Sequence, residues 1–379
     1  MKNVLLHLEF YISSVQRLHK GVVEYAQERD WHLTVSGPHF TFPEYWNGDG
    51  VLLHLNDARE KHAFLKRNPD IPVVSFTMPI KNSGLKFSTV REDDFKIGKI
   101  AAQHFIENGC RHACWYGSGK IDLRGRSFLR RMRHRGIDTS LITPPISPRE
   151  VPWDLKNTWL AEQLSKLSLP CSVFCENDAW AYEILEAALL VGLKIPEDIS
   201  ILGVDNNSLV CECLKVPLSS VDNRLERVGY EGAALLDAMM DGKRGPHELI
   251  LVPPAPEVVA RKSTDALAID HPNLKRAVAY IRENFDSNDI SVKKIAQAAY
   301  VSESGIRKLF KKHFNTSVLH LVHKLRIQKA CSLLRETSLK IDAIASQVGF
   351  GDTRRFYDVF TREMSTSPAR FRKEQAEVF

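Results

Sequence analysis

The sequence predicts a parallel α/β fold over residues 1–262, followed by an all-helical region that begins at residue 273. Three observations support this division. Short β-branched apolar runs alternate with helical patterns in the first part, the Pro-rich segment Leu249–Asp265 ends the alternation, and only helical patterns follow it. Strands that alternate with helices usually pair in parallel through right-handed crossovers. The first part is therefore expected to contain parallel sheets.

The strands expected in this first part are short apolar runs bounded by Gly, Asn, Asp or His. In chain order they cover residues 3–8, 32–37, 50–55, 71–76, 112–117, 172–177 and 198–205. Amphipathic helices are expected between them, with the clearest patterns at residues 15–28, 96–109 and 179–193. In such folds a ligand lies beyond the carboxyl ends of the strands, so the residues just after each run are candidates for binding.

Composition and charge indicate a globular protein with a polyanionic partner. The chain has 379 residues, of which 44% are hydrophobic and 26% charged, which is typical of two or three globular domains. No apolar run is long enough to span a bilayer, and the N-terminus lacks the features of a signal peptide, so a cytoplasmic location is predicted. From Asp270 onward 20 Lys and Arg residues stand against 12 Asp and Glu, which favours nucleic acid as a partner.

The seven cysteines do not indicate a disulfide framework or a metal site. Two CxxxC pairs occur, Cys110 with Cys114 and Cys171 with Cys175, but no histidine follows at ligand spacing. The second cysteine of each pair lies in an apolar, strand-like run. Buried thiols are therefore expected, and neither a metal nor another cofactor is predicted.

The helical region contains a weak internal repeat at residues 292–317 and 341–368. Both copies have an apolar helix with small residues, a turn, a capped amphipathic helix and a polar exit. Each copy is predicted to be a helix-turn-helix unit. A long helix between them, Val318–Leu334, would hold the two second helices about one DNA turn, roughly 34 Å, apart.

The second helix of each unit is the candidate for reading DNA. Its apolar face is expected to be buried, which leaves the opposite face free near the helix N-terminus, where side chains reach base edges in a major groove. The candidate DNA-binding residues are Ser304, Arg307, Lys308, Thr353, Arg354, Arg355 and Asp358. For one such helix a solvated surface is the simpler interpretation, but two in tandem within a basic region favour DNA binding.

Asn273–Arg372 resembles the AraC-type DNA-binding domain. The most specific stretch is residues 341–373, with its Gly-Phe turn, aromatic and Phe residues on the reading helix, a Pro, and a terminal Phe-Arg pair. The sequence departs from the family at Asn315 and Ser365, where Gly is usual, and at Val318, where the first unit often has Pro. The resemblance implies a DNA-binding domain at residues 273–379.

Val173–Asn206 is similar to the effector domains of LacI-type repressors and periplasmic sugar-binding proteins. The similarity runs from an apolar strand through Asn-Asp and a helix to the stretch IPEDISILGVDN. It implies that residues 1–262 form a sensor of two α/β lobes with a sugar in the cleft between them. Residues 263–272 would then form a linker to the DNA-binding domain.

The candidate ligand-binding residues follow strand ends or are implied by the resemblance. They are Asp205, Asn177, Asp178, Arg126, Trp153 and Tyr11. Carboxylates and Arg form strong charge-assisted bonds with ligand hydroxyls, and an indole covers an apolar sugar face. Each has a structural alternative: Asp178 as a helix cap, Asp205 as a turn residue, and Trp153 as part of the core.

A sugar sensor ahead of an AraC-type reader resembles bacterial activators of pentose catabolic genes. The resemblance implies D-xylose as the first effector, operator DNA and RNA polymerase as partners, and a homodimer. One alternative is a sugar-active enzyme in which Glu176, Asp178 and Asp205 supply a carboxylate pair, although no nucleophile elbow, phosphate-binding Gly-rich loop or HExxH motif is present. A transport component that binds sugar is the other alternative, and the basic C-terminal region argues against it.

Overall fold

The computed structural model describes residues 1–8, 13–36, 44–54, 59–77, 87–119, 121–144, 151–264, 271–314, 316–364 and 366–376. The chain divides into two compact units. The first comprises Met1–Phe105 with Cys110–Ala266, and the second comprises Ile106–Gly109 with Leu267–Phe379. An α/β unit is thus followed by a helical one, as the sequence predicts.

The first unit contains two six-stranded sheets, each the centre of one lobe. The first sheet has the order β11-β5-β4-β3-β1-β2, and all of its pairs are parallel. Its strands and the helices of this lobe are β1 (Asn3–His7), α1 (Ser13–Glu28), β2 (His32–Ser36), β3 (Gly50–Leu53), α2 (Arg59–Arg67), β4 (Val73–Ser75), β5 (Ser88–Glu92), α8 (Leu225–Met240) and β11 (Leu249–Val252).

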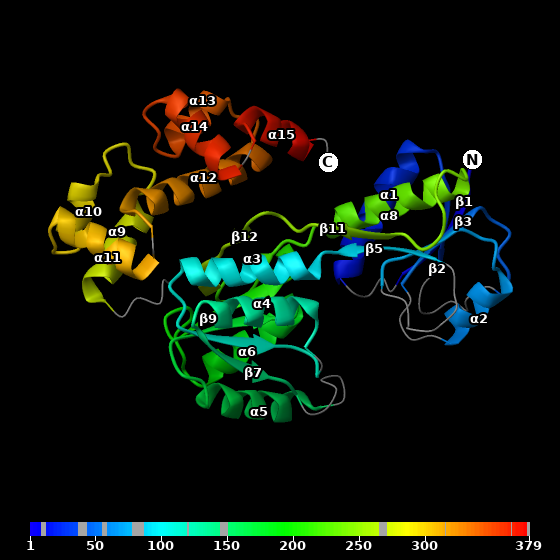
Figure 1. Ribbon diagram of the computed structural model, residues 1–379, viewed down its shortest axis with the longest axis horizontal. Helices are drawn as coiled ribbons and strands as arrows, with labels where there is room; N and C mark the ends of the chain where they lie inside the picture. Colours follow the sequence, from blue (N-terminus) through cyan, green and yellow to red (C-terminus); the bar gives the residue numbers. More distant parts are fainter. Residues whose placement is uncertain are drawn as a thin grey trace. The chain divides into compact units, whose positions relative to one another are not determined.

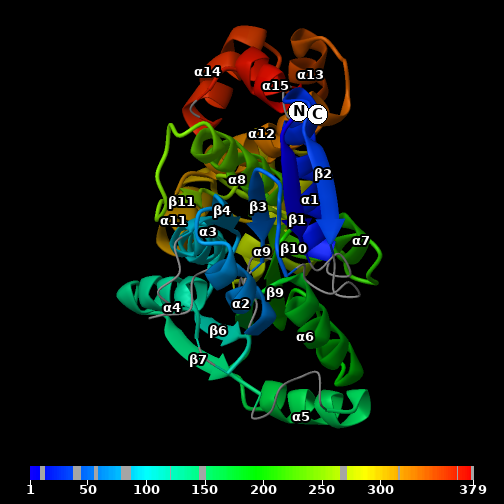
Figure 2. The same ribbon diagram turned by 90° about the vertical axis from the view of Figure 1, so that its right-hand side faces the viewer.

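The second sheet has the order β12-β10-β9-β8-β6-β7, and only the β10–β12 pair is antiparallel. The elements of this lobe are α3 (Asp94–Glu107), β6 (His112–Tyr116), α4 (Leu123–His134), β7 (Asp138–Ile142), α5 (Trp153–Ser165), β8 (Cys171–Cys175), α6 (Asp178–Leu190), β9 (Ile199–Val204), α7 (Ser208–Cys211), β10 (Ser219–Val221), β12 (Val258–Val259) and the short 3-10 helix η1 (Lys262–Thr264). Figure 2 shows β7 at the edge of this sheet, next to β6.

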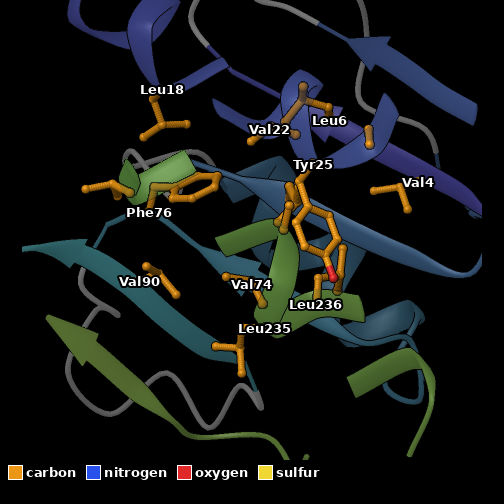
Figure 3. Close-up of a cluster of buried hydrophobic side chains, with 14 of the residues drawn as sticks. Val4, Leu6, Leu18, Val22, Tyr25, Val74, Phe76, Val90, Leu235 and Leu236 are labelled. Carbon is orange, nitrogen blue, oxygen red and sulfur yellow. The ribbon is translucent and has the colours of Figure 1, made fainter. Parts of the chain in front are cut away.

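The chain passes between the lobes three times, after β5, after β10 and after β11. The two α/β lobes are what the similarity to sugar-binding proteins implies. In the first lobe, α1 and α8 lie side by side (Figure 1) and bury their apolar faces together with the sheet. Figure 3 shows this core, in which Leu18 and Val22 of α1, Leu236 of α8, and Val4 and Val74 of the sheet are buried.

All seven predicted strands are present, but five further strands were missed. β5 ends in polar residues, β7 lies at a sheet edge with partly exposed residues, and β10, β11 and β12 have two to four residues each. Short or edge strands bury too little to show a clear apolar run. Two residues of the predicted linker, Ser263 and Thr264, are instead buried against the second sheet. The Ser263 hydroxyl donates to the main-chain carbonyl of Ile201, and the Thr264 hydroxyl donates to the Ser219 hydroxyl. Residues 265–270 lie outside the described residues.

The second unit is helical. Its helices are α9 (Pro272–Asn284), α10 (Val292–Ala298), α11 (Glu303–Phe314), α12 (Val318–Glu336), α13 (Ile341–Gln347), α14 (Thr353–Met364) and α15 (Pro368–Ala376). The pairs α10–α11 and α13–α14 are the predicted helix-turn-helix units, and α12 is the long helix between them. Two apolar cores, one around Phe310 and one around Phe360, stabilise the two units.

Among the described residues, no helix is long and apolar enough to cross a membrane. The cysteines of the two CxxxC pairs are buried free thiols, as predicted. Burial raises the pKa of Cys110 to about 11 and that of Cys114 to about 12. These thiols therefore stay protonated and contribute to packing at neutral pH.

Candidate functional site

The first helix-turn-helix unit presents a basic helix with one buried stripe. The Ser302 hydroxyl caps α11 by accepting a bond from the Gly305 amide at 3.1 Å. Ile306 and Phe310 are fully buried, while the predicted DNA-binding residues Ser304, Arg307 and Lys308 are exposed. The free face therefore carries the predicted side chains near the helix N-terminus, and their contact with bases remains a prediction.

The second unit repeats this arrangement on α14. Phe356, Val359 and Phe360 are buried, and Arg354, Arg355 and Asp358 are exposed, whereas Thr353 is half-buried. The Asp352 carboxylate accepts a bond from the Arg354 amide at 2.8 Å. The turn before α14 is one residue longer than the turn before α11, because the ends of α10 and α13 are 49 residues apart and the starts of α11 and α14 are 50 apart.

The loop between α9 and α10 connects the two helix-turn-helix units. Arg326 of α12 is buried, and its guanidinium donates to the carbonyls of Phe285 at 2.6 Å and Ser287 at 2.8 Å. The same guanidinium lies 5.1 Å from the ring centroid of Phe350 in the second unit. These contacts hold the loop, α12 and the second unit's turn together. We therefore expect them to influence the spacing of α11 and α14.

Replacing Arg307 or Arg354 with alanine is expected to weaken operator binding by about 1–3 kcal/mol if the side chain reads a base. Fluorescence anisotropy with labelled upstream DNA at fixed salt measures this loss. Arg362→Ala is the matched control, because Arg362 is exposed on the last turn of α14 and pairs with Glu363 at 3.0 Å. Equal losses for Arg354→Ala and Arg362→Ala would reduce Arg354 to a general electrostatic contribution.

In the sensor, Asp205 lies just after β9 in the second lobe. Its φ of 103° is unusual for a residue other than Gly. Asn223, in the crossing segment after β10, donates from Nδ2 to the Asp205 carboxylate at 2.8 Å. Desolvation of this carboxylate by the surrounding protein raises the pKa of Asp205 to about 7, and the nearby charge of Asp178 adds to the shift.

Asn223 is 1% exposed, and its Oδ1 has no hydrogen-bond partner in the described parts of the chain. A buried amide oxygen without a donor calls for a water or a ligand hydroxyl. This open acceptor next to Asp205 marks the crossing segment as one wall of the candidate effector site.

Arg124 is the buried cation of the same region. Its guanidinium donates to the Asp94 carboxylate at 2.8 Å, to Glu92 at 3.2 Å, and to the main-chain carbonyl of Glu176 at 2.7 Å. Glu92 ends a strand of the first lobe, so Arg124 joins the two lobes. Burial by itself disfavours the charge, but these carboxylates raise the pKa of Arg124.

Arg17 of α1 makes a second connection across the lobes. Its guanidinium bonds the main-chain carbonyl of Asp205, pairs with Asp222 at 3.1 Å, and pairs with Glu226 of α8 at 2.6 Å. The backbone that positions the Asp205 carboxylate is therefore tied to the first lobe. A change in lobe geometry would move this residue.

The other predicted ligand residues lie as follows. Asn177 caps α6 by accepting bonds from the amides of Ala179 at 3.0 Å and Trp180 at 3.2 Å. Asp178 is 2% exposed, and its carboxylate accepts bonds from the Ser220 hydroxyl at 2.6 Å and the Asn207 amide at 2.9 Å. This geometry favours structural roles for both.

Two predicted aromatic residues receive no support. Trp153 is 59% exposed at the start of α5, so it is not part of the core, and its contact with a ligand stays a prediction. Tyr11 lies outside the described residues.

Arg126 is exposed, and its Nε donates to the main-chain carbonyl of Asp122 at 3.3 Å. The structure thus puts Arg124, and not Arg126, next to Asp205. Helical spacing does not separate the two arginines, because Arg124 lies four residues before the buried Phe128 and Arg126 lies three residues before the buried Leu129.

The raised pKa of Asp205 predicts a pH-dependent stability of the sensor. The group titrates at 3.8 when unperturbed and at about 7 in the fold, so the folded protein binds the extra proton between these values. The free energy of unfolding should therefore fall as pH rises from about 4 through about 7. Asp205→Asn should weaken this dependence, leaving the part due to burial of Asp178 and Asp122, whose pKa values are each raised to about 6, whereas Asp154→Asn, at an exposed site, should not.

All six tryptophans lie in the first unit, so tryptophan fluorescence during urea unfolding follows the sensor alone. An unchanged pH profile for Asp205→Asn would show that other groups carry the dependence.

Comparison with known proteins matches both parts of the chain. Residues 102–264 match the periplasmic binding protein-like domain family, and residues 295–374 match a helix-turn-helix domain family. The xylose operon regulatory protein of Escherichia coli strain K12 is 28% identical over 376 residues, covering 95% of this chain and 94% of that protein. The protein of the same name from Haemophilus influenzae is 26% identical and covers 86% of this chain.

Among solved structures, a xylose-binding transcription activator aligns over 98% of both chains, with a TM-score of 0.61 and 25% identity. A binding-protein-like sensor followed by a double helix-turn-helix domain defines a transcription regulator with an AraC-type reader. The chain is a homologue of the xylose operon regulatory proteins along nearly its whole length.

Proposed function

We propose that this protein is a xylose-responsive activator of pentose catabolic genes, and that it acts as a dimer without enzymatic activity. The main support is the charged junction between the lobes, where Asp205, Asn223 and Arg124 meet, in a chain that also carries two exposed basic reading helices. The relatives named for xylose supply the first effector to test.

In this proposal Asp205 accepts hydrogen bonds from sugar hydroxyls, Asn223 offers its open Oδ1, and Arg124 replaces Arg126 as the cation of the site. Carboxylates and guanidinium groups suit a polyol, because their charge-assisted bonds are strong and directional. Asn177 and Asp178 support the site by holding α6 and the loop after β9. An acid–base pair for catalysis is not favoured, because Asp178 and Glu176 accept bonds from protein donors.

The sugar would act by stabilising one arrangement of the lobes. Arg17 and Arg124 each join the two lobes beside Asp205, so a ligand here has different contacts in different lobe geometries. Only such a difference in affinity can shift a conformational equilibrium. In a dimer the shift would change the spacing of two readers on the operator, and the bound dimer would then recruit RNA polymerase.

Titration of the full-length protein with D-xylose, L-arabinose, D-ribose and D-glucose tests the effector assignment by calorimetry. D-Xylose is expected to bind most tightly, and Asp205→Asn should weaken it by roughly tenfold to a hundredfold, since a hydrogen bond to a charged group is lost. Asp154→Asn, on the exposed surface of α5, is the control and should bind xylose as the wild type does. Binding of another sugar, or of none, would overturn the xylose assignment.

A further inference from the structure

Helices α3 and α4 form a cationic pocket of about 300 Å³ on the second lobe. Its lining consists of Phe95, Lys99, Ser127, Arg130, Arg131, His134 and Arg135, with no carboxylate among them. Helix α4 as a whole carries five arginines and no acidic residue. The positive charge of the protein is therefore not confined to the reader.

Close packing of the two helices forms the base of the pocket. A Cβ at Gly98 of α3 would lie 2.1 Å from the Arg124 carbonyl of α4, so only Gly fits this approach. The Ser127 hydroxyl donates to the Phe95 carbonyl at 2.8 Å. Arg130, Arg131, His134 and Arg135 follow one another at helical spacing on a single face of α4, and Lys99 faces them from α3. Figure 1 shows the two helices side by side.

The cations of this pocket are poorly neutralised. In the described parts of the chain, Lys99, Arg130 and Arg135 form no ion pair, and the Nε of Arg131 has no hydrogen-bond partner. The Arg131 Nη2 donates to the neutral Gln103 side chain at 2.7 Å. Like charges gathered in one concave site repel one another and concentrate anions there. A bound anion would relieve this repulsion.

We propose that the pocket binds a small phosphorylated metabolite as a second effector. Arginine forks match the oxygens of a phosphate group, and Lys99 adds a point charge from the opposite wall. The half-exposed Phe95 ring supplies an apolar surface for the organic part of the ligand. A volume of about 300 Å³ is at the lower end of small-molecule sites. A DNA duplex fits less well, because its phosphates follow an extended line and the cations of the pocket gather around one open hollow.

The pocket shares its two helices with the sugar site, which gives a route for coupling. Phe95 directly follows Asp94, the partner of Arg124, and Ser127 lies three residues after Arg124 on α4. A phosphate bound to α4 would therefore bias the position of the Arg124 cluster. By linkage, the sugar and the phosphorylated ligand would alter each other's affinity by the same factor.

The test is calorimetric titration of the full-length protein with glucose 6-phosphate and with inorganic phosphate, with glucose as the uncharged control and ionic strength fixed by NaCl. Glucose 6-phosphate is expected to bind saturably with one site per chain. The double variant Lys99→Gln with Arg130→Gln should weaken this binding by at least about tenfold, because two charged contacts are removed. The matched control is Lys96→Gln with Arg133→Gln, which removes one Lys from α3 and one Arg from α4 outside the pocket.

Equal binding by the two double variants would overturn the proposal, as would the absence of saturable binding of either phosphate at millimolar concentration. A non-operator DNA duplex forms the third arm: if Lys99→Gln with Arg130→Gln weakens its binding and Lys96→Gln with Arg133→Gln does not, while neither phosphate binds saturably, the basic face contacts DNA and the proposal fails. D-Xylose titrations of the same preparations keep the two questions apart. If neither phosphate binds, D-xylose should still bind. If D-xylose does not bind, the titration with glucose 6-phosphate still tests the pocket on its own.

Discussion

Arg124→Leu is expected to lower the free energy of unfolding of the sensor by about 3–5 kcal/mol, because it removes the buried cation that pairs with Glu92 and leaves Asp94 with Arg91 alone. Asp94 is 7% exposed, and its partner in α4 is the Arg124 guanidinium at 2.6 Å. The change should also abolish the response to sugar, since the cluster joins the two lobes. Urea unfolding followed by tryptophan fluorescence measures the first effect.

Arg126→Leu is the matched control for this variant, two residues away on the same helix. Arg126 is exposed, so its replacement should change the free energy of unfolding by no more than about 0.5 kcal/mol and leave sugar affinity unaltered. The reverse result, with sugar binding lost in Arg126→Leu and kept in Arg124→Leu, would restore the role that the sequence gave to Arg126. Equal stability of both variants would contradict the buried cluster.

The second large effect is expected at Gly349, in the turn before α14. Its φ is +89°, and a Cβ would lie 2.6 Å from the carbonyl oxygen of Asp286 in the loop between α9 and α10. Gly349→Ala should therefore destabilise the reader by about 1–3 kcal/mol and displace α14 from its position relative to α11. Loss of operator affinity in anisotropy titrations, with sugar binding unchanged, is the expected signature.

Gly351 lies two residues further along the same turn, and a Cβ there would have no atom within 4 Å. Gly351→Ala should thus bind operator DNA much as the wild type does. If the two variants behaved alike, the contact between the turn and the Asp286 loop would not be what fixes the spacing of the two reading helices.

The sequence predicted the elements whose burial imposes a strong pattern. The apolar stripe of α11, with Ile306 and Phe310, and the strand that ends before Asp205 are both fully buried, and both were found. The helix-turn-helix repeat was also visible, since Phe356 and Phe360 occupy the positions in α14 that Ile306 and Phe310 have in α11. In these cases the spacing of apolar residues within a short segment shows which face of that segment is buried.

The site was harder to predict because it depends on contacts between distant segments. Arg17, Arg124 and Asn223 approach Asp205 from three separate parts of the chain, and no local pattern shows this. Asp178 has the strand-end position of a ligand residue, yet the Ser220 hydroxyl occupies its carboxylate from 42 residues away. The basic helix α4 was also missed when charges were counted over the whole sensor, because acidic residues elsewhere in the sensor offset the positive charge of α4.

Binding of the full-length protein to its own upstream DNA, at fixed salt and with and without D-xylose, tests the central claim most directly. Fluorescence anisotropy should show specific binding that D-xylose tightens and that L-arabinose, D-ribose and D-glucose do not. The same titration with Asp205→Asn should need roughly tenfold to a hundredfold more D-xylose to reach the same tightening. Specific DNA binding that no sugar changes would contradict a sugar-responsive regulator. It would then support only the DNA-binding role of the helix-turn-helix domain.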